Sequence, residues 1–247
     1  MVVTGIDLAA ARAPDGMRLY AIGDVHGRLD LLERMHARIR AEIAASRPAD
    51  WRIVHVGDYV DRGPQSKGVI DFLIDATRTD PRHVALGGNH DAAMLEFLRG
   101  ADTDGLFARF GGRETALSYG VDADFASPAL ARRTADALLA AMPPAHVDFL
   151  ERLPLSVSFG DFFFCHAGIR PGVPLERQDP NDLIWIRDVF LNDPRLHPKV
   201  IVHGHTPAPQ AQVLANRVNV DTGAFRSNRL TALVVDCAAK RTIEVGI

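Results

Sequence analysis

The sequence predicts an α/β fold in which two packed β-sheets are flanked by helices and joined by a helical insertion. Three observations lead to this prediction. A unit of short apolar strand, polar turn and amphipathic helix repeats in the first third of the chain, a mainly helical stretch follows, and strands then return. With 247 residues, 47% of them hydrophobic, the chain is long enough to bury one core, so we expect a single domain over residues 1–247.

The repeated units at the start of the chain predict a parallel sheet. Short apolar runs at 19–22, 52–56 and 83–86 are expected strands, and each ends in a glycine-containing polar turn. Between the runs, apolar residues recur at the spacing of one helix face, at Leu32, Met35, Ile39 and Ile43 and again at Val69, Ile70, Leu73 and Ile74. The turns are separated by about 30 residues, the length of one βαβ unit. Their polar side chains should therefore meet at the carboxyl edge of the sheet, where such sheets bind ligands.

Residues 91–152 predict a helical insertion beside the mouth of this site. The apolar residues that fit one helix face are Met94, Leu95 and Leu98. Ser127 followed by Pro128 is typical of the start of a second helix, and the prolines at 143–144 predict its end.

The last third of the chain predicts a second sheet, mixed or antiparallel. Residues 156–159 and 162–165 form an expected hairpin around a Gly-Asp turn. The later strands are expected at 200–202, 217–220, 230–235 and 242–245. The turn at 226–228, Arg-Ser-Asn, lacks the glycine that we expect there, and the pattern leaves this unexplained.

Composition and charge exclude several partners. The formal net charge is −3, so no basic excess attracts nucleic acid or an anionic membrane, and phosphate recognition must be local. Residues 1–16 lack a secretion signal and no stretch reaches transmembrane length, so we expect a cytoplasmic protein. Cys165 and Cys237 are expected to be reduced core thiols. Nothing in the sequence indicates the oligomeric state.

Five polar blocks follow the expected strands in a fixed order. They are Gly23-Asp24-Val25-His26-Gly27, Gly57-Asp58-Tyr59-Val60-Asp61-Arg62-Gly63, Gly88-Asn89-His90-Asp91, Cys165-His166-Ala167-Gly168 and Val202-His203-Gly204-His205-Thr206. Each block alone is typical of an ordinary turn, a core histidine or a surface arginine. Their joint order at strand ends favours one shared site instead.

The residue types in these blocks indicate a pair of transition-metal ions. Asp, Asn and His offer oxygen and imidazole ligands, which suit manganese, iron or zinc better than calcium. Two such ions about 3.5–4 Å apart clamp a phosphoryl group and generate hydroxide at neutral pH. A bridging carboxylate is the simplest way to hold them, and Asp58, central in the order of blocks, is the natural candidate.

The order of the blocks resembles the phosphoprotein phosphatase family of calcineurin-like metallophosphoesterases, and most of all its compact bacterial and phage serine/threonine phosphatases. The motifs span residues 24–206, and the second block is the most specific. The resemblance implies an α/β/β/α sandwich and two divalent ions, manganese by preference, with iron, zinc or cobalt as alternatives. It assigns one ion to Asp24, His26 and Asp58, and the other to Asp58, Asn89, His166 and His205.

The resemblance also assigns the groups that handle phosphate and protons. His90 would protonate the leaving group, and Asp61 would hold His90 in place. Arg62, Asn89 and Arg187 would bind the phosphate, with Arg187 matched through the segment Ile184-Trp185-Ile186-Arg187. His203 is not a ligand in the family pattern. The implied mechanism is direct in-line attack on phosphorus by a bridging hydroxide.

Three functions follow from this pattern. The expected one is a serine/threonine protein phosphatase that acts on a phosphoprotein or a small phosphoester. The alternative is a symmetrical dinucleoside tetraphosphate hydrolase, a family whose second block usually has alanine where this chain has Asp61. A non-catalytic regulatory module is the third, and it is disfavoured because every expected ligand and His90 are present.

Overall fold

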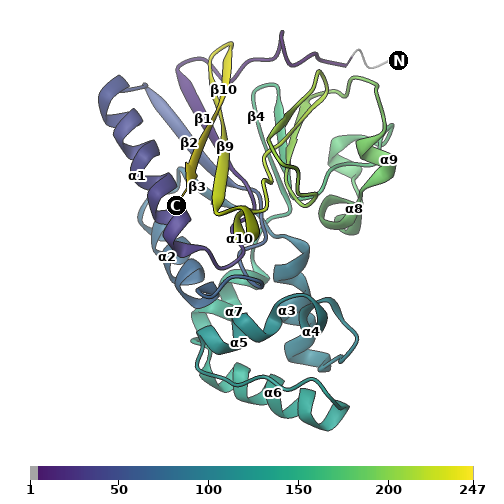
Figure 1. Cartoon of the computed structure of the whole chain (residues 1–247). Coiled ribbons are helices and arrows are strands. Elements are labelled where there is room, and N and C mark those ends of the chain that lie inside the picture. Colours follow the sequence, from purple (N-terminus) through teal and green to yellow (C-terminus); the bar gives the residue numbers. More distant parts are fainter. Residues whose placement is uncertain (1–4, 247) are drawn as a thin grey trace.

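Two five-stranded sheets pack face to face in the computed structural model, which describes residues 5–246 (Figure 1). The first sheet has the order β10-β9-β1-β2-β3 and the second β4-β5-β6-β8-β7. The first is built from β1 (Met17–Ile22), β2 (Asp50–His55), β3 (His83–Ala85), β9 (Arg229–Asp236) and β10 (Ala239–Gly246). The second is built from β4 (Ser156–Phe159), β5 (Phe162–Cys165), β6 (Val200–His203), β7 (Gln212–Val213) and β8 (Arg217–Asn219). The predicted fold class is confirmed.

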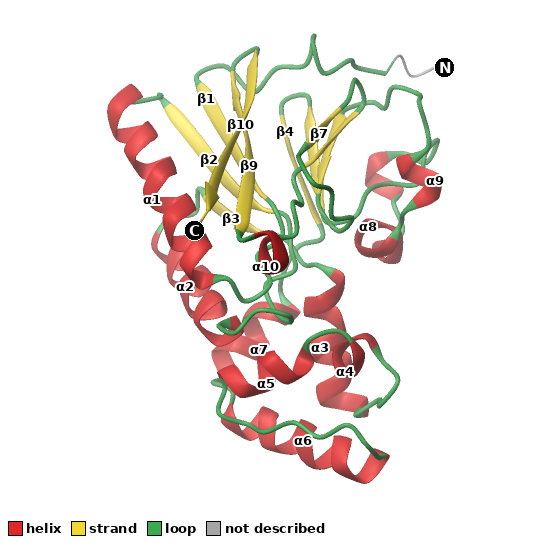
Figure 2. Ribbon diagram, in the orientation of Figure 1, coloured by secondary structure: helices red, strands yellow, loops and turns green. Residues whose placement is uncertain are grey.

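The strand–helix repeat forms the parallel part of the first sheet. Strands β1, β2 and β3 are parallel neighbours, joined by α1 (Leu29–Ser46) and α2 (Ser66–Thr79). Of the residues predicted to line one face of helix α1, Leu32, Met35 and Ile39 are buried and Ile43 is half-buried. Both helices cover the outer face of this sheet (Figure 2), so the three polar turns share its carboxyl edge.

Strands β9 and β10 belong to the first sheet, which corrects the prediction that they join the second. β9 pairs antiparallel with β1, and β10 pairs antiparallel with β9. Six consecutive residues of β9, 230–235, are buried. A strand buried on both faces belongs inside a sheet, and the run 230–235, apolar except for Thr231, was a sign of that position. The second sheet contains both parallel and antiparallel pairs, which agrees with the prediction of a mixed or antiparallel sheet.

Alternating side chains of β1 divide the core into layers. Leu19 and Ala21 face the second sheet and pack with Phe162, Phe164 and other residues of its strands. Tyr20 and Ile22 face the opposite way and pack under α1. On the far side, α8 (Pro180–Trp185) and α9 (Asp188–Leu191) cover the second sheet through a separate apolar cluster.

The helical insertion lies beyond the carboxyl edge of the first sheet, at the bottom of Figure 1. It contains α3 (Asn89–Gly100), α4 (Leu106–Arg109), α5 (Gly112–Ser118), α6 (Pro128–Ala141) and α7 (Pro144–Glu151). Ser127 caps α6 as predicted, because its hydroxyl accepts a hydrogen bond from the backbone N–H of Leu130. The apolar residues of this insertion form one cluster with those of α2 and of the turns after β1 and β2.

Two local features differ from expectation. Asn228 ends the short helix α10 (Ala224–Ser227) at a φ of 54°, a left-handed conformation that asparagine tolerates well, so the turn needs no glycine. Cys165 is buried, but Cys237 is not a core thiol. It lies half-buried in the turn between β9 and β10, where its Sγ accepts a hydrogen bond from Arg12.

Within residues 5–246, we find no helix that is both long enough and apolar enough to cross a bilayer. The prediction that residues 1–16 contain no secretion signal lies partly outside the described residues, because these begin at residue 5.

Candidate metal centre

Strand ends from both sheets meet at one point and bring the five blocks together. Asp24, Asp58 and Asn89 follow β1, β2 and β3, while His166 and His205 follow β5 and β6 of the second sheet. All five side chains are buried. The close approach requires glycine, because a Cβ on Gly204 would overlap the carboxylate of Asp24.

Asp58 occupies the middle of this cluster. Its Oδ2 lies 3.4 Å from Nε2 of His26, and its Oδ1 lies 3.3 Å from Nε2 of His166. Potential ligand atoms of Asp24, Asp58 and His166 all lie within 4.8 Å of one another, and so do those of His26, Asp58 and His90. Asp58 alone belongs to both groups, which is the geometry that a bridging ligand requires.

Two imidazoles turn Nε2 toward the centre. Nδ1 of His26 lies 2.8 Å from the carbonyl of Val60, and Nδ1 of His166 lies 3.0 Å from the carbonyl of Val56. A carbonyl only accepts, so both Nδ1 atoms carry a proton, which leaves Nε2 of His26 with a lone pair. A cation would have to replace a second proton on Nε2 of His166, because the pKa of that ring is raised. A hydrogen bond that fixes Nδ1 in this way is typical of metal-binding histidines.

The amide oxygen of Asn89 completes the donor set. It lies 2.9 Å from Nε2 of His166 and 2.8 Å from Nδ1 of His205. Oxygen and nitrogen atoms that can bind a metal thus converge from Asp24, His26, Asp58, Asn89, His166 and His205. These residues fit a pair of divalent ions.

Several carboxyl groups are buried close together at this centre. Burial raises the pKa of Asp24 well above its usual range, with Asp221 and Asp58 adding to the effect. Burial opposes charge on His166, but Asp58 and the other nearby carboxylates outweigh it and raise its pKa to about 9. By contrast, burial lowers the pKa of His26 to about 3. Several carboxylates in one buried place favour bound cations.

His90 and Asp61 form a close buried pair. Nδ1 of His90 lies 2.6 Å from Oδ2 of Asp61. Thr115, from helix α5 of the insertion, donates to Oδ1 of Asp61 at 2.9 Å and accepts from its backbone N–H. Burial raises the pKa of Asp61, against the effect of these hydrogen bonds. The imidazole is therefore held at Nδ1, and Nε2 is directed away from Asp61.

The two predicted arginines reach histidines of the centre. Arg62 contacts Nε2 of His26 at 3.1 Å and Nε2 of His90 at 2.9 Å, and its guanidinium lies 4.7 Å from the ring centre of Phe225. Arg187, between α8 and α9, donates from Nε to Nε2 of His205 at 3.0 Å. Both are therefore close enough to meet a phosphoryl group at the centre.

Other residues shape the site without having been assigned a role from sequence. Asp91 accepts hydrogen bonds from the backbone N–H groups of Asp58, Tyr59 and Gly88, and so joins the second block to the third. Asp91 belongs to the third block, but no role was predicted for it from the sequence. Asp221 lies just after β8 and two residues before Gly223. The first two blocks also place an aspartate near a glycine after a strand, so this pattern could have revealed Asp221. Thr115 has no sequence signal.

His203 lies outside the cluster, as expected. It is the last residue of β6 and is fully buried, and its Nε2 lies 3.3 Å from Nη1 of Arg217.

Backbone strain is concentrated at this centre. Positive φ values between 44° and 70° occur at His26, Asp58, Asp61, Arg62 and His205. Left-handed conformations of residues other than glycine are unfavourable and are typically retained at functional sites.

Two packed sheets with this cluster at their shared edge define a metallophosphoesterase. The chain belongs to the calcineurin-like phosphoesterase family, whose model matches residues 17–235. The family assignment agrees with the resemblance found in the sequence, and it makes the protein a metal-dependent hydrolase of phosphoesters.

Individual relatives differ in what they act on. The chain is 27% identical to an asymmetrical bis(5'-nucleosyl)-tetraphosphatase, PrpE, of Anoxybacillus flavithermus, over 86% of this chain and 88% of that protein. It is 29% identical to a symmetrical bis(5'-nucleosyl)-tetraphosphatase of Dechloromonas aromatica, over 63% of this chain but only 45% of that longer protein. A serine/threonine phosphatase of Saccharomyces cerevisiae shares the fold with a TM-score of 0.57 at 14% identity, covering 94% of this chain and 80% of that one.

Proposed function

We propose that this protein hydrolyses the phosphoanhydride bonds of dinucleoside polyphosphates at a dinuclear metal centre. The observation that carries the proposal is an arginine-rich cleft of about 790 Å³ beside the centre. The names of the tetraphosphatase relatives support the same substrate class. This replaces the phosphoprotein as the first expectation.

The cleft has the charge that a polyphosphate needs. In the described part of the chain, five arginines line it, against a single carboxylate, that of Glu114. The arginines are Arg62, Arg109, Arg113, Arg187 and Arg226. Arg109 and Arg113 form ion pairs with exposed aspartates, which are weak in water. Arg62, Arg187 and Arg226 have no carboxylate partner among residues 5–246. One phosphate group does not need so many cations, whereas a chain of phosphates does.

Aromatic rings in the same cleft provide surfaces for a nucleobase. Phe110 is 54% exposed, and Phe125 and Phe225 also line the cleft. Bases stack on aromatic side chains with little dependence on sequence. Arg62, Arg187 and His205 belong both to the cleft and to the surroundings of the metal centre, so a bound polyphosphate would reach the centre from the cleft.

We assign one ion to Asp24, His26 and Asp58 and the second to Asp58, Asn89, His166 and His205, with manganese preferred over iron, zinc or cobalt. When bound, the two ions would neutralise phosphoryl oxygens and lower the pKa of water. Arg62 and Arg187, with the Asn89 amide, orient the phosphoryl group. His90 would protonate the leaving oxygen from Nε2 once Arg62, which donates to that nitrogen in this structure, turns to the phosphoryl group, and Asp61 fixes the ring.

A serine/threonine phosphatase is the second candidate, and the Asp61–His90 pair favours it. An alkoxide is a poor leaving group and needs a proton, whereas a nucleotide phosphate leaves with much less help. The Asp61 carboxylate lies 2.6 Å from Nδ1 of His90 and holds the ring firmly. A general acid held in this way contributes more to the hydrolysis of an alkyl ester than to that of a phosphoanhydride.

Removing positive charge from the cleft should separate the two substrate classes. The variants Arg226→Gln and Arg113→Gln should each lower kcat/KM for diadenosine tetraphosphate by about tenfold, because each loses a charged hydrogen bond to phosphate. Hydrolysis of p-nitrophenyl phosphate should be unchanged, since that substrate is too short to reach either side chain. Steady-state kinetics with excess manganese measure both effects.

The matched control is Arg78→Gln, an exposed arginine on α2 that is not among the residues lining the cleft. Equal losses on both substrates, or a higher kcat/KM for a phosphoserine peptide than for diadenosine tetraphosphate, would contradict the first candidate. The second outcome would establish the protein phosphatase in its place.

A further inference from the structure

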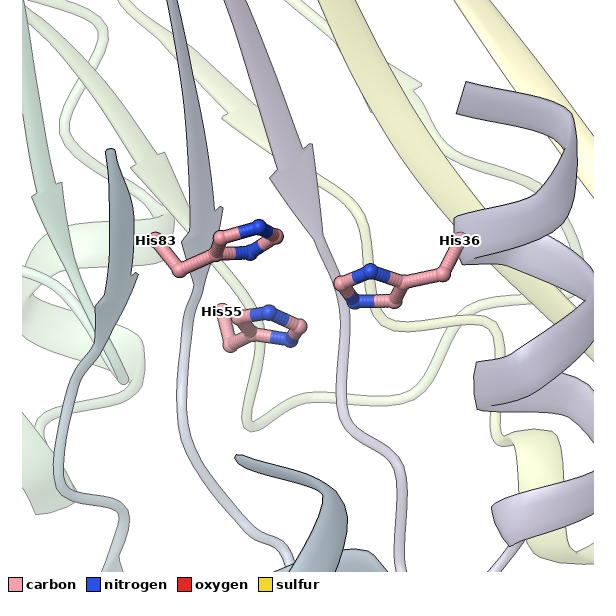
Figure 3. A group of neighbouring side chains, drawn as sticks. All are labelled: His36, His55 and His83. Carbon is pink, nitrogen blue, oxygen red and sulfur yellow. The ribbon is translucent and has the colours of Figure 1, made fainter. Parts of the chain in front are cut away.

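Three histidines lie together away from the proposed catalytic centre, on the face of the first sheet that α1 covers (Figure 3). His36 belongs to α1, His55 ends β2 and His83 begins β3. The ring of His36 lies 5.1 Å from that of His55 and 5.4 Å from that of His83, measured between centroids. One nitrogen from each ring lies within 4.8 Å of the other two. Figure 3 shows the His36 ring reaching from the helix toward the other two.

Four of the six ring nitrogens of this cluster are buried without hydrogen-bond partners among residues 5–246. They are Nε2 of His36, both nitrogens of His55 and Nδ1 of His83. His36 is 1% exposed and His55 is fully buried. Since nearly all buried polar atoms in native proteins are paired, four unpaired nitrogens in one place indicate a missing ligand.

The chemistry of the cluster selects the kind of ligand. Burial lowers the pKa of His36 to about 3 and also lowers that of His55 and His83, so all three rings are neutral with free lone pairs. Three neutral imidazoles are typical ligands of zinc, whereas magnesium and calcium prefer oxygen. Two arginines lie near the cluster: Arg82 donates several hydrogen bonds to Asp80, which balances its charge, and Arg40 acts on His36 and His83.

We propose that His36, His55 and His83 form a third metal site, specific for an imidazole-preferring ion such as zinc. Tetrahedral zinc with bonds of about 2.0–2.1 Å places its ligand nitrogens about 3.4 Å apart. The His36 ring is nearly parallel to those of His55 and His83, at 12° and 16°, so zinc binding would require the rings to move inward and to turn their nitrogens toward the ion. His83 is half-buried and also lines a groove of about 490 Å³ between α2 and α7, through which an ion and a water ligand could enter.

Such an ion would connect α1 to β2 and β3, the two strands that carry Asp58 and Asn89 at their ends. The site is independent of the substrate proposed above, because none of its three side chains belongs to the metal centre or the arginine-rich cleft.

Metal counting on stripped and reloaded protein tests the proposal. After removal of metal with a chelator, loading with zinc and removal of the excess, wild-type protein should hold three ions per chain by mass spectrometry. His83→Gln and His36→Gln should hold two. Zinc should also raise the Tm of the Asp58→Asn variant, in which only the third site remains, and this rise should disappear in the double variant Asp58→Asn/His83→Gln.

The matched control is His197→Gln, since His197 is also buried, with no partner for its Nε2 within residues 5–246, but lies elsewhere. It should keep three ions. Equal zinc content in wild type and His83→Gln, with the same Tm shift in the single Asp58 and the double variant, would overturn the proposal. His83 is the more exposed position, so its variant remains informative if His36→Gln does not fold. Hydrolysis of p-nitrophenyl phosphate by manganese-loaded His83→Gln should equal that of wild type.

Discussion

Asp58→Asn is expected to lose bound metal and turnover together, with kcat/KM for p-nitrophenyl phosphate falling by more than about 10³-fold. Asp58 is the one residue shared by both groups of potential ligands at the centre. An amide keeps the shape of the side chain but removes the charge that two cations would share. Asparagine also tolerates the left-handed backbone at this position, where φ is 55°, so the fold should be retained.

Elemental analysis, steady-state kinetics and a thermal melt of the same preparation measure these effects. Asp75→Asn, an exposed aspartate on α2, serves as the control and should behave as wild type. A folded Asp58→Asn protein with full metal content and normal turnover would show that the side chain does not bridge the ions.

The His90→Asn variant is expected to keep its metal but lose kcat in proportion to the need of the leaving group for a proton. On a phosphoserine peptide, the loss should be about 10²–10⁴-fold, the usual contribution of a general acid. On p-nitrophenyl phosphate and diadenosine tetraphosphate, whose leaving groups are stable anions, the loss should stay below about tenfold. The reason is the position of His90, whose ring is held by Asp61 with Nε2 directed away from that carboxylate.

Asp61→Asn should show the same dependence on the leaving group with a smaller loss, because the imidazole stays but is less firmly oriented. Comparable losses on all three substrates would instead mean that His90 acts on binding or on the metal centre. Metal content, measured in parallel, separates those two explanations.

Local patterns predicted much of the fold because they depend on nearby residues. The helix-face spacing in 32–43 and the glycine-containing turns determined the parallel β1-β2-β3 unit. β9 could pair with any of several apolar strands that are far from it in the sequence. Spacing along the chain therefore could not predict that it pairs with β1. The mainly apolar run 230–235 was a local indication that this strand lies inside a sheet.

The candidate site was also predictable only in part. The order of the polar residues at strand ends predicted which side chains lie near Asp58, because the topology brings these strand ends to one edge. The hydrogen bond from Thr115 to Asp61 and the arginines of the insertion depend on how α4 and α5 pack above that edge. Those contacts arise from tertiary packing, and they include the features that favour a polyphosphate over a phosphoprotein.

The dinuclear centre is tested most directly by anomalous diffraction from crystals of the manganese-loaded wild-type protein, recorded at the manganese absorption edge. We expect two strong peaks about 3.5–4 Å apart, one on each side of the Asp58 carboxylate. Asp24 and His26 should contact one peak, and Asn89, His166 and His205 the other. A single peak, or peaks away from Asp58, would contradict the proposed centre.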